Sequence, residues 1–594
     1  MTAPTWLRAA RPLALGSAWG AAEVAVRVEP RMGLDAAAVA SWLAISVGLA
    51  VAIAALGAAL SALVARAARA GDRVEAALLA GGVLTIVLAF NYRFEVVLNE
   101  LVRDPRVWGG MSALAVVGLA LGALVAPVLG RPRVLGGLAL VGVALAAVAF
   151  VRAAAPRPTP GQGPSFLIIT LDTVRPDRLS PYGHDNDTPA LARLAREGVT
   201  FTQAVAAAPI TEPSHLAMFT GVPPIGSGVV SNGTRLGDRP LLVWRALRER
   251  GWSTAAWVSG FPLHGKYGWT QGMDIYDDDF GDVAGVQHLT IVKAWNQVAL
   301  EAHALRERSA DRVLARAVPW LERNRDARFF AWVHLYDAHA PYESPYNVDL
   351  PPPPTEGARL TSLPAFWPAQ WRAVTSVAWL AQAYDAELRW VDHAVGRLVD
   401  ALGPRLDDTV VVVLADHGES LGEHEYWFDH GDNLYDPSLR IPFLVRAPGR
   451  AVAGLRPGCQ VGAVDLAPTV LALAGVDDAQ TREGRSLTDV LAGGPCVELP
   501  VFASTIAGRH MDDPPTDHAL RGKGHKLIVH DDDSTELYDL DADPHERANL
   551  GPTPLSEQMT AAVRARRDAS AVASPEMDAD TLHALEALGY LERR

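Results

Sequence analysis

Cysteine is almost absent from this chain of 594 residues, which contains only Cys459 and Cys496. Two cysteines cannot form a cysteine-rich metal framework, and they permit one disulfide bond at most. The sequence also lacks a long basic stretch, because it has 53 basic and 67 acidic residues and a net charge of −14. This balance gives no indication of a nucleic-acid partner, and we expect none.

Charged residues are scarce in residues 1–155, which consist mostly of alanine, leucine, valine and glycine. A membrane-spanning helix needs roughly 17–25 apolar residues. A buried helical domain of a soluble protein is the alternative, but nearly every charge lies between the apolar runs. We therefore predict an all-α transmembrane domain of about five helices over residues 1–155, in contact with the lipid bilayer. The runs are Leu13–Val28, Ala36–Val64, Val74–Phe90, Gly109–Leu129 and Val134–Val151.

Arginine residues orient these spans, because positive charge prefers the cytoplasmic side of a membrane. They stand before the first run and in the second and fourth connections, at Arg8, Arg11, Arg66, Arg69, Arg73, Arg131 and Arg133. We predict a multi-pass protein of the cell membrane whose catalytic part is extracytoplasmic, on the periplasmic or outer face. A Pro/Gly linker (156–164), a catalytic core (165–500) and a C-terminal subdomain with a tail (501–594) are expected to follow.

Apolar strands and amphipathic helices alternate after the linker. The stretches SFLIITLDT (165–173) and TVVVVLADHGE (409–419) have the pattern of buried strands that end in acidic residues or histidine. Residues 188–199 and 386–402 have helical spacing, and Thr188 is positioned to cap the first of these helices. This alternation predicts an α/β domain with a mainly parallel sheet, in which ligands bind at the carboxyl ends of strands.

Asp172 and the pair Asp416-His417 each follow a predicted strand. A lone aspartate at a strand end is more often a cap or turn residue, and an Asp-His pair can simply be hydrogen-bonded. Carboxylates and an imidazole together suit a hard or borderline divalent cation. The sequence does not distinguish calcium, manganese, magnesium and zinc.

Thr211 stands in the stretch APITEPSHLAMFTG (208–221), just before Pro213 and an apolar helical segment. Threonine is a common N-cap, so capping alone would explain this residue. A helix N-terminus also attracts anions, and a hydroxyl beside a metal ion can ionise as metal-bound water does. Thr211 is therefore interpreted as a cap, a nucleophile or both.

Several histidines and a lysine stand near predicted strand ends. Each of them alone is more often structural, whereas their number favours a cleft that binds oxyanions. They are His264, Lys266, His334, His339, His424 and His430, with Asp337 among them.

Ordered motifs run from residue 164 to about residue 550: LDTVRPDRLSPYG, TEPSHLAMFTG, HLYDAHAPY, ADHGESLGEHEYWFDHG, VDLAPTVLALAGV, LRGKGHKLI and ELYDLDADPHERANL. Together they resemble the sulfatase family of the alkaline phosphatase superfamily. The resemblance implies an α/β fold in which helices sandwich a mainly parallel sheet. It also implies a small C-terminal α+β subdomain with a short antiparallel sheet.

The resemblance assigns roles to individual residues. The implied metal ligands are Asp172, Thr211, Asp416 and His417, and the implied catalytic residues are Thr211, His215, Lys266, His339 and His430. Thr211 matches the nucleophile, whereas His339 and Lys266 match positions that hold the substrate oxyanion. His215 stands where the family usually has an arginine.

Thr211 departs from the family pattern, which has cysteine or serine that is oxidised to formylglycine. Threonine cannot yield that aldehyde, so we expect no formylglycine; a threonine nucleophile instead resembles the phosphodiesterases and phosphotransferases of the superfamily. The sequence therefore predicts a membrane-anchored, metal-dependent hydrolase of sulfate or phosphate esters. The alternatives are a phosphotransferase that moves a phosphoglycerol or phosphoethanolamine group and a catalytically degenerate binding module.

Overall fold

The computed structural model describes residues 163–569, with gaps at 238–241, 279, 281–306, 325–326, 347–349, 355–362, 364–366, 368–370, 372–373, 478–481, 507–515 and 523. All described residues belong to one compact unit. The predicted membrane-spanning segments and most of the predicted linker lie outside them. Within the described part of the chain, no helix combines the length and the apolar character that crossing a bilayer requires.

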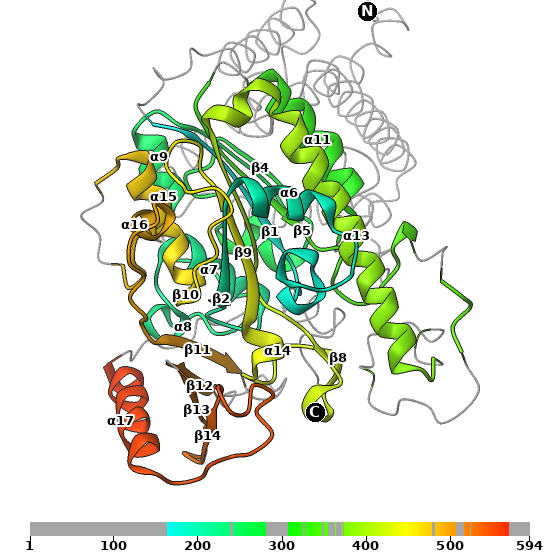
Figure 1. The fold of residues 1–594 in the computed structure, drawn as a ribbon. Coiled ribbons are helices and arrows are strands. Elements are labelled where there is room, and N and C mark those ends of the chain that lie inside the picture. Colours follow the sequence, from blue (N-terminus) through cyan, green and yellow to red (C-terminus); the bar gives the residue numbers. More distant parts are fainter. Residues whose placement is uncertain are drawn as a thin grey trace, which may run out of the picture. The chain divides into compact units, whose positions relative to one another are not determined.

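An eight-stranded sheet forms the centre of this unit, in the order β10-β2-β9-β6-β1-β5-β3-β4 (Figure 1). The five strands from β6 through β1, β5 and β3 to the edge strand β4 are parallel, and β9 runs antiparallel to both of its neighbours. The sheet is therefore mixed but mainly parallel, as predicted. Its strands are β1 (Ser165–Leu171), β2 (Val199–Val205), β3 (Ser253–Trp257), β4 (Ile275–Asp277), β5 (Phe329–Leu335), β6 (Thr409–Ala415), β9 (Arg440–Arg446) and β10 (Gln460–Gly462).

Helices cover both faces of this sheet, and every residue of β1, β5 and β6 is buried as a result. One layer contains α6 (Pro189–Glu197), α11 (Ala310–Arg323) and α13 (Val377–Ala401), and the other contains α7 (Thr211–Thr220), α9 (Val243–Glu249) and α15 (Leu466–Ala474) (Figure 1). α13 contains most of the helix expected over 386–402.

The N-terminus of α6 is capped by a tertiary contact. The Thr188 side chain, expected as the cap, makes no cap hydrogen bond and contacts Ser180 instead. The N–H groups of Ala190 and Leu191 donate to the carboxylate of Asp392 on α13, at 3.0 and 2.8 Å. The expectation for Thr188 was wrong because a carboxylate from another helix satisfies these donors.

A second sheet follows in the chain and is antiparallel throughout. It consists of β11 (Val501–Ile506), β12 (Thr516–Arg521), β13 (His525–Val529) and β14 (Thr535–Asp539), with α17 (Pro554–Ala569) packed on it. A small apolar cluster around Leu527, Leu537 and Val563 gives this part a core of its own. Cys459, before β10, and Cys496, before β11, form a disulfide with their Cα atoms 6.0 Å apart.

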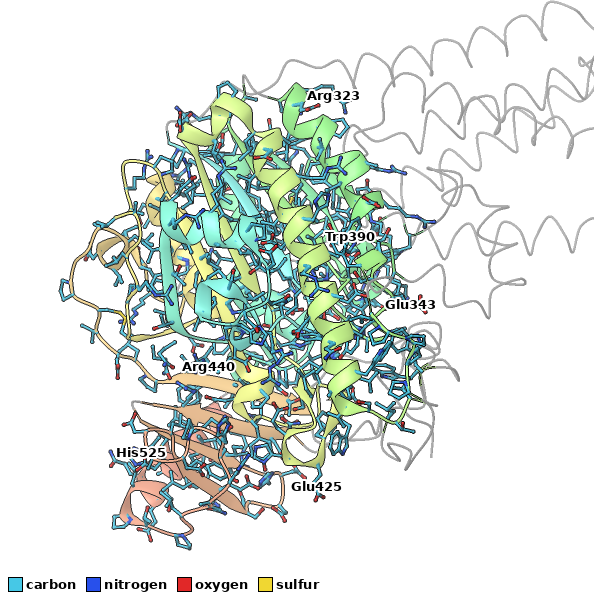
Figure 2. All side chains as sticks on the ribbon, turned by 45° about the vertical axis from the view of Figure 1, so that its right-hand side comes forward. Arg323, Glu343, Trp390, Glu425, Arg440 and His525 are labelled. Atoms are coloured by element: carbon cyan, nitrogen blue, oxygen red, sulfur yellow. A yellow bond between two sulfur atoms is a disulfide. The ribbon has the colours of Figure 1, made fainter. Side chains whose placement is uncertain are left out.

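A buried group of charges joins the second sheet to the first. Asp436 begins α14 (Asp436–Leu439), and its carboxylate accepts hydrogen bonds from Arg521 at 3.1 and 2.9 Å and from Lys526 at 2.8 Å. Glu546 accepts from the Asp436 N–H at 2.7 Å and pairs with Lys526. Burial alone would raise the pKa of Asp436, but Lys526 and Arg521 together lower it. Figure 2 marks Arg440 on the core side of this junction and His525 on the C-terminal sheet.

Candidate active site

The site segments follow neighbouring strands of the central sheet. Leu171, the last residue of β1, is paired in parallel register with Ala415, the last residue of β6. Asp172 and Asp416 come directly after these residues, and the Asp416 N–H donates to the Leu171 carbonyl at 3.1 Å. The register of two buried strands therefore brings both carboxylates to the same edge of the sheet.

Asp172, Asp416 and His417 form a compact group, in which one ligand atom from each residue lies within 4.8 Å of the others. His417 Nε2 is 3.6 Å from Asp416 Oδ2 and 3.9 Å from Asp172 Oδ1. All three side chains are fully buried. Asp172 Oδ1, Asp416 Oδ2 and His417 Nε2 have no hydrogen-bond partner among the described residues.

The electrostatics of this group favour a bound cation. Burial raises the pKa of Asp172, and burial together with the neighbouring Asp172 raises the pKa of Asp416 well above its ordinary value. The His417 Nδ1–H donates to the Gly418 carbonyl at 2.9 Å, so the Nε2 lone pair of the neutral ring faces the two carboxylates. Two carboxylates and an imidazole with open ligand atoms fit a divalent cation, although no particular ion is specified.

Thr211 is the first residue of α7, and its hydroxyl does not cap that helix. The N-cap residue is Ile210, which has no side-chain cap hydrogen bond. Thr211 Oγ1 instead donates to Asp172 Oδ2 at 3.3 Å, and the Ser214 hydroxyl donates to the Asp416 carbonyl at 2.6 Å. The N-terminal turn of α7, whose dipole and free N–H groups favour anions, is thus fixed against the acid group.

His215 lies behind this turn. It is fully buried, and its Nδ1–H donates to the Thr211 carbonyl at 2.8 Å. The same nitrogen is 3.5 Å from Asp416 Oδ2. His215 therefore supports the backbone of Thr211 from inside the protein.

His339 and His430 extend the site beyond His417. The His430 ring lies 4.5 Å from the His417 ring and 4.9 Å from the His339 ring, measured between centroids. The His339 ring stacks on Tyr336, and its Nδ1–H donates to the Ala340 carbonyl at 2.8 Å. Burial lowers the pKa of His339 to about 3, so this ring is neutral in the folded protein.

Lys266 lies in another environment, with its ammonium group 4.8 Å from the Phe261 ring centroid and 4.9 Å from that of Tyr267. Burial raises the pKa of Glu212, the neighbour of Thr211, well above its ordinary value, and the positive charge of Lys266 opposes this rise. The predicted oxyanion contact of Lys266 stays a prediction.

Three other candidates have local structural contacts. His264 accepts a hydrogen bond from the Lys266 N–H at 3.0 Å, His424 stacks on Tyr435, and Asp337 accepts from Trp390 Nε1 at 3.0 Å. These contacts agree with the structural interpretation that the sequence offered for each of them.

Glu419 is a site residue that sequence reasoning missed. Its Oε2 accepts a hydrogen bond from the Tyr342 hydroxyl at 2.7 Å, and its Oε1 lies 3.8 Å from His430 Nδ1. Burial raises the pKa of Glu419 to about 8. Its position two residues after His417 was the available signal, but the sequence does not show that the chain folds back beside His430.

Comparison with protein families gives two matches. A family model described as Sulfatase matches residues 164–476, and one described as N-sulphoglucosamine sulphohydrolase, C-terminal, matches residues 422–571. A sulfatase of Formosa agariphila is 26% identical over 439 residues, which cover 65% of this chain and 82% of that protein. A choline-sulfatase of Rhizobium meliloti is 33% identical over 195 residues, which cover 32% of this chain and 36% of that protein.

Solved structures show the same fold. A phosphonate monoester hydrolase of Agrobacterium radiobacter superposes with a TM-score of 0.56 at 20% identity. The superposed part covers 68% of this chain and 96% of that one.

Proposed function

Because the chain belongs to the sulfatase family, whose model matches residues 164–476, we propose that it hydrolyses sulfate or phosphate esters with Thr211 as the nucleophile. We further propose that phosphate esters, especially diesters, are the faster substrates. One observation carries the assignment of the nucleophile: the Thr211 hydroxyl donates to Asp172 of the acid group and caps no helix.

Asp172, Asp416 and His417 would hold a divalent cation. Such an ion lowers the pKa of a neighbouring hydroxyl and stabilises charge that develops on substrate oxygens. Asp172 Oδ2 accepts the hydrogen bond of Thr211 and is placed to take its proton. His339 and His430 border His417 and are the proposed contacts for the substrate oxyanion.

The reaction would proceed in two displacements. The Thr211 oxygen forms a bond to phosphorus or sulfur while the bond to the ester oxygen breaks, and the leaving alcohol takes a proton from solvent. Water then attacks the transferred atom while its bond to the Thr211 oxygen breaks; one proton of the water goes to solvent, and Asp172 returns its proton to the threonine oxygen. A sulfate ester or phosphate monoester thus yields the inorganic anion, and a phosphodiester yields a phosphate monoester.

The second displacement favours phosphate over sulfate esters. A formylglycine hydrate can release sulfate by collapsing to its aldehyde, whereas a threonine ester has no such route. Attack by water on the transferred atom is therefore required, and superfamily members that resemble this arrangement perform it readily at phosphorus. Relatives named as sulfatases keep sulfate esters among the substrates to be tested.

The test is turnover of aryl sulfate, phosphate monoester and phosphodiester substrates by the full-length protein. We expect Thr211→Ala to abolish turnover and Thr211→Ser to retain part of it, since a hydroxyl remains. Both variants should stay folded because Thr211 makes no cap bond. Thr202→Ala on β2, whose hydroxyl bonds to the Pro457 carbonyl, is a matched control that should keep full activity.

Full activity in Thr211→Ala, or a clear preference of the wild type for sulfate esters, would contradict this proposal. Specific ligand binding without turnover of any substrate would instead support the degenerate binding module.

We also propose that residues 1–155 anchor the enzyme in the cell membrane, with the catalytic part outside the cytoplasm. The distribution of arginines supports this topology, and the Cys459–Cys496 disulfide suits an oxidising compartment. A reporter fused after Gly163 should be active only outside the cytoplasm. Cytoplasmic reporter activity would defeat the proposed topology.

A further inference from the structure

Glu212, the residue after Thr211, has a fully buried side chain that the proposed reaction does not use. A buried carboxylate costs free energy unless hydrogen bonds replace those that it made with water. The carboxylate of Glu212 binds one short loop, residues 231–234. The N–H groups of Gly233 and Thr234 both donate to Glu212 Oε2, the second at 3.1 Å. One oxygen of a buried glutamate thus holds the backbone of this loop.

The loop binds Glu212 in return. Asn232 Oδ1 accepts a hydrogen bond from the Glu212 N–H at 2.8 Å. This N–H lies in the first turn of α7, where backbone donors have no partner within the helix. Each segment therefore binds the backbone of the other through a side chain, as in a capping box, but between residues 20 positions apart in the chain.

Loop 231–234 is a firm support, because its own contacts close it. Thr234 Oγ1 donates to the Ser231 carbonyl at 3.0 Å, and Gly233 has a left-handed backbone, with φ 83°, which glycine adopts without strain. The side chains of Ser231, Asn232 and Thr234 are buried. Packing and internal hydrogen bonds therefore fix the loop to which Glu212 is bound.

The same turn of α7 is attached to the acid group at a second place. The Ser214 hydroxyl donates to the Asp416 carbonyl at 2.6 Å, and the Thr211 hydroxyl donates to Asp172 Oδ2 at 3.3 Å. The turn that carries Thr211 is thus held by the acid group and by loop 231–234. Without the carboxylate of Glu212, two buried N–H groups of the loop would lose their acceptor, and the second attachment would loosen.

We propose that Glu212 is a positioning residue for the nucleophile. Its carboxylate holds loop 231–234, and the loop holds the first turn of α7 so that the Thr211 oxygen is aligned with the transferred atom. This inference rests on Thr211 as the nucleophile of the proposed function. Glu212 acts as a hydrogen-bond acceptor in this role and not through its charge, because a negative charge beside Thr211 would oppose ionisation of the hydroxyl.

Steady-state kinetics of the full-length protein test this role, with the substrate of the panel that the wild type turns over fastest. Glu212→Met removes the acceptor and nearly keeps the size of the side chain. A misplacement of about 1 Å can cost about a hundredfold in rate, so we expect kcat to fall by about this factor. KM and cation affinity should be kept, because no substrate contact and no cation ligand is removed. Glu212→Gln should keep most of kcat, since its amide oxygen can accept from both N–H groups.

Asp392→Leu is the matched control. Asp392 is also a buried carboxylate that accepts hydrogen bonds from two successive N–H groups, but at the start of α6. We expect this control to lose stability in urea as Glu212→Met does, while its kcat stays that of the wild type. If Glu212→Met does not fold, Glu212→Asp replaces it; the carboxylate is then one methylene shorter, and kcat should fall at least about tenfold.

Wild-type kcat in the folded Glu212→Met variant, an equal loss of kcat in the control, or a rise of KM at unchanged kcat would overturn this inference. A loss in Glu212→Gln as large as that in Glu212→Met would overturn it too, since the charge would then be required. In each of these cases an inactive Thr211→Ala variant leaves the proposed function standing. If Thr211→Ala is fully active, the assignment of the nucleophile fails, and this inference fails with it.

Discussion

Asp172 and Asp416 at the candidate site and Asp436 at the junction with the C-terminal sheet are all buried carboxylates, with exposures of 0%, 0% and 8%. The charged partners of Asp436 are Arg521 and Lys526. In the described part of the chain, the side chains at ion-pair distance from Asp172 and Asp416 are buried histidines, whose rings are neutral. The pKa of Asp436 is accordingly lowered, whereas those of Asp172 and Asp416 are raised by burial.

The two sets of carboxylates therefore differ in role. The carboxylate of Asp436 stabilises the fold through its ion pairs, whereas those of Asp172 and Asp416 are suited to bind a cation. At the junction, side chains supply the positive charge, so the carboxylate is stabilised as soon as the chain folds. At the site, neutral imidazoles leave the negative charge uncompensated, and a bound cation can supply the balance. Removing an acid should therefore have opposite consequences in the two places.

The largest effect is expected for Asp416→Asn. Loss of a ligand should abolish cation binding. Several kcal/mol of transition-state stabilisation would be lost with the cation, so kcat/KM should fall at least about a hundredfold. Without cation, the variant should be as stable as the wild type or more so, because an uncompensated buried charge is removed. Metal analysis and urea unfolding in chelator measure both effects, and unchanged metal content would show that Asp416 is not a ligand.

Asp436→Asn should have the opposite result. It leaves Lys526 and Arg521 buried with less countercharge, so we expect the free energy of unfolding to fall by about 3–5 kcal/mol while cation affinity is kept. Asp185→Asn, whose side chain is 99% exposed, is the matched control and should change neither quantity. Equal stability of Asp436→Asn and the control in urea would mean that the junction charges do not hold the fold.

Removal of the cation should destabilise the wild type by a smaller amount. An ion present at 100 times its dissociation constant stabilises the folded state by about 2.7 kcal/mol, which a chelator should reverse. Asp436→Asn should keep this response and Asp416→Asn should lose it. A chelator-induced loss of stability in Asp416→Asn equal to that of the wild type would place the responsible ion elsewhere.

The smallest effect concerns His530 in the C-terminal subdomain. Hydrogen bonds to Asp517 (2.7 Å) and Glu536 (3.2 Å) raise the pKa of His530 to about 10. The folded state therefore holds this proton more tightly than the unfolded state, whose pKa is about 6.5. Its stabilisation is complete below pH 6.5 and is lost as the pH rises towards 10.

We expect His530→Gln to flatten this part of the stability profile, measured by urea unfolding between pH 6 and pH 10 while turnover at neutral pH is followed in parallel. A profile identical to that of the wild type would show that His530 does not carry the pH dependence.

The sequence predicted the mainly parallel α/β sheet and the acid group because both depend on local patterns. Buried apolar runs that end in Asp172 and in Asp416-His417 are visible as strings of letters, and parallel strands bring their carboxyl ends to one edge of the sheet. The sequence does not show which strands lie next to each other in the sheet. The pairing of β1 with β5, which sets Thr170 opposite His334, results from packing of the whole sheet.

Caps show the same limit. Thr211 and Thr188 both have sequences typical of N-caps, yet neither side chain makes a cap hydrogen bond. The Thr211 hydroxyl donates to Asp172. The Ala190 N–H at the start of α6 donates to Asp392, which stands 202 residues later in the chain. Such long-range partners outcompete a local cap, and short motifs do not reveal them.

The two outermost strands of the central sheet, β10 and β4, contain three residues each, far shorter than the seven-residue strands β1, β5 and β6 inside it. At the β10 edge, the Gln460 amide donates to the Leu499 and Arg521 carbonyls, and the disulfide at Cys459 restrains the adjacent backbone. Short and tethered edges offer few open backbone groups to a strand from another molecule. Such edges disfavour the addition of a strand from another molecule. We therefore expect the central sheets of two copies not to join edge to edge when the protein is concentrated.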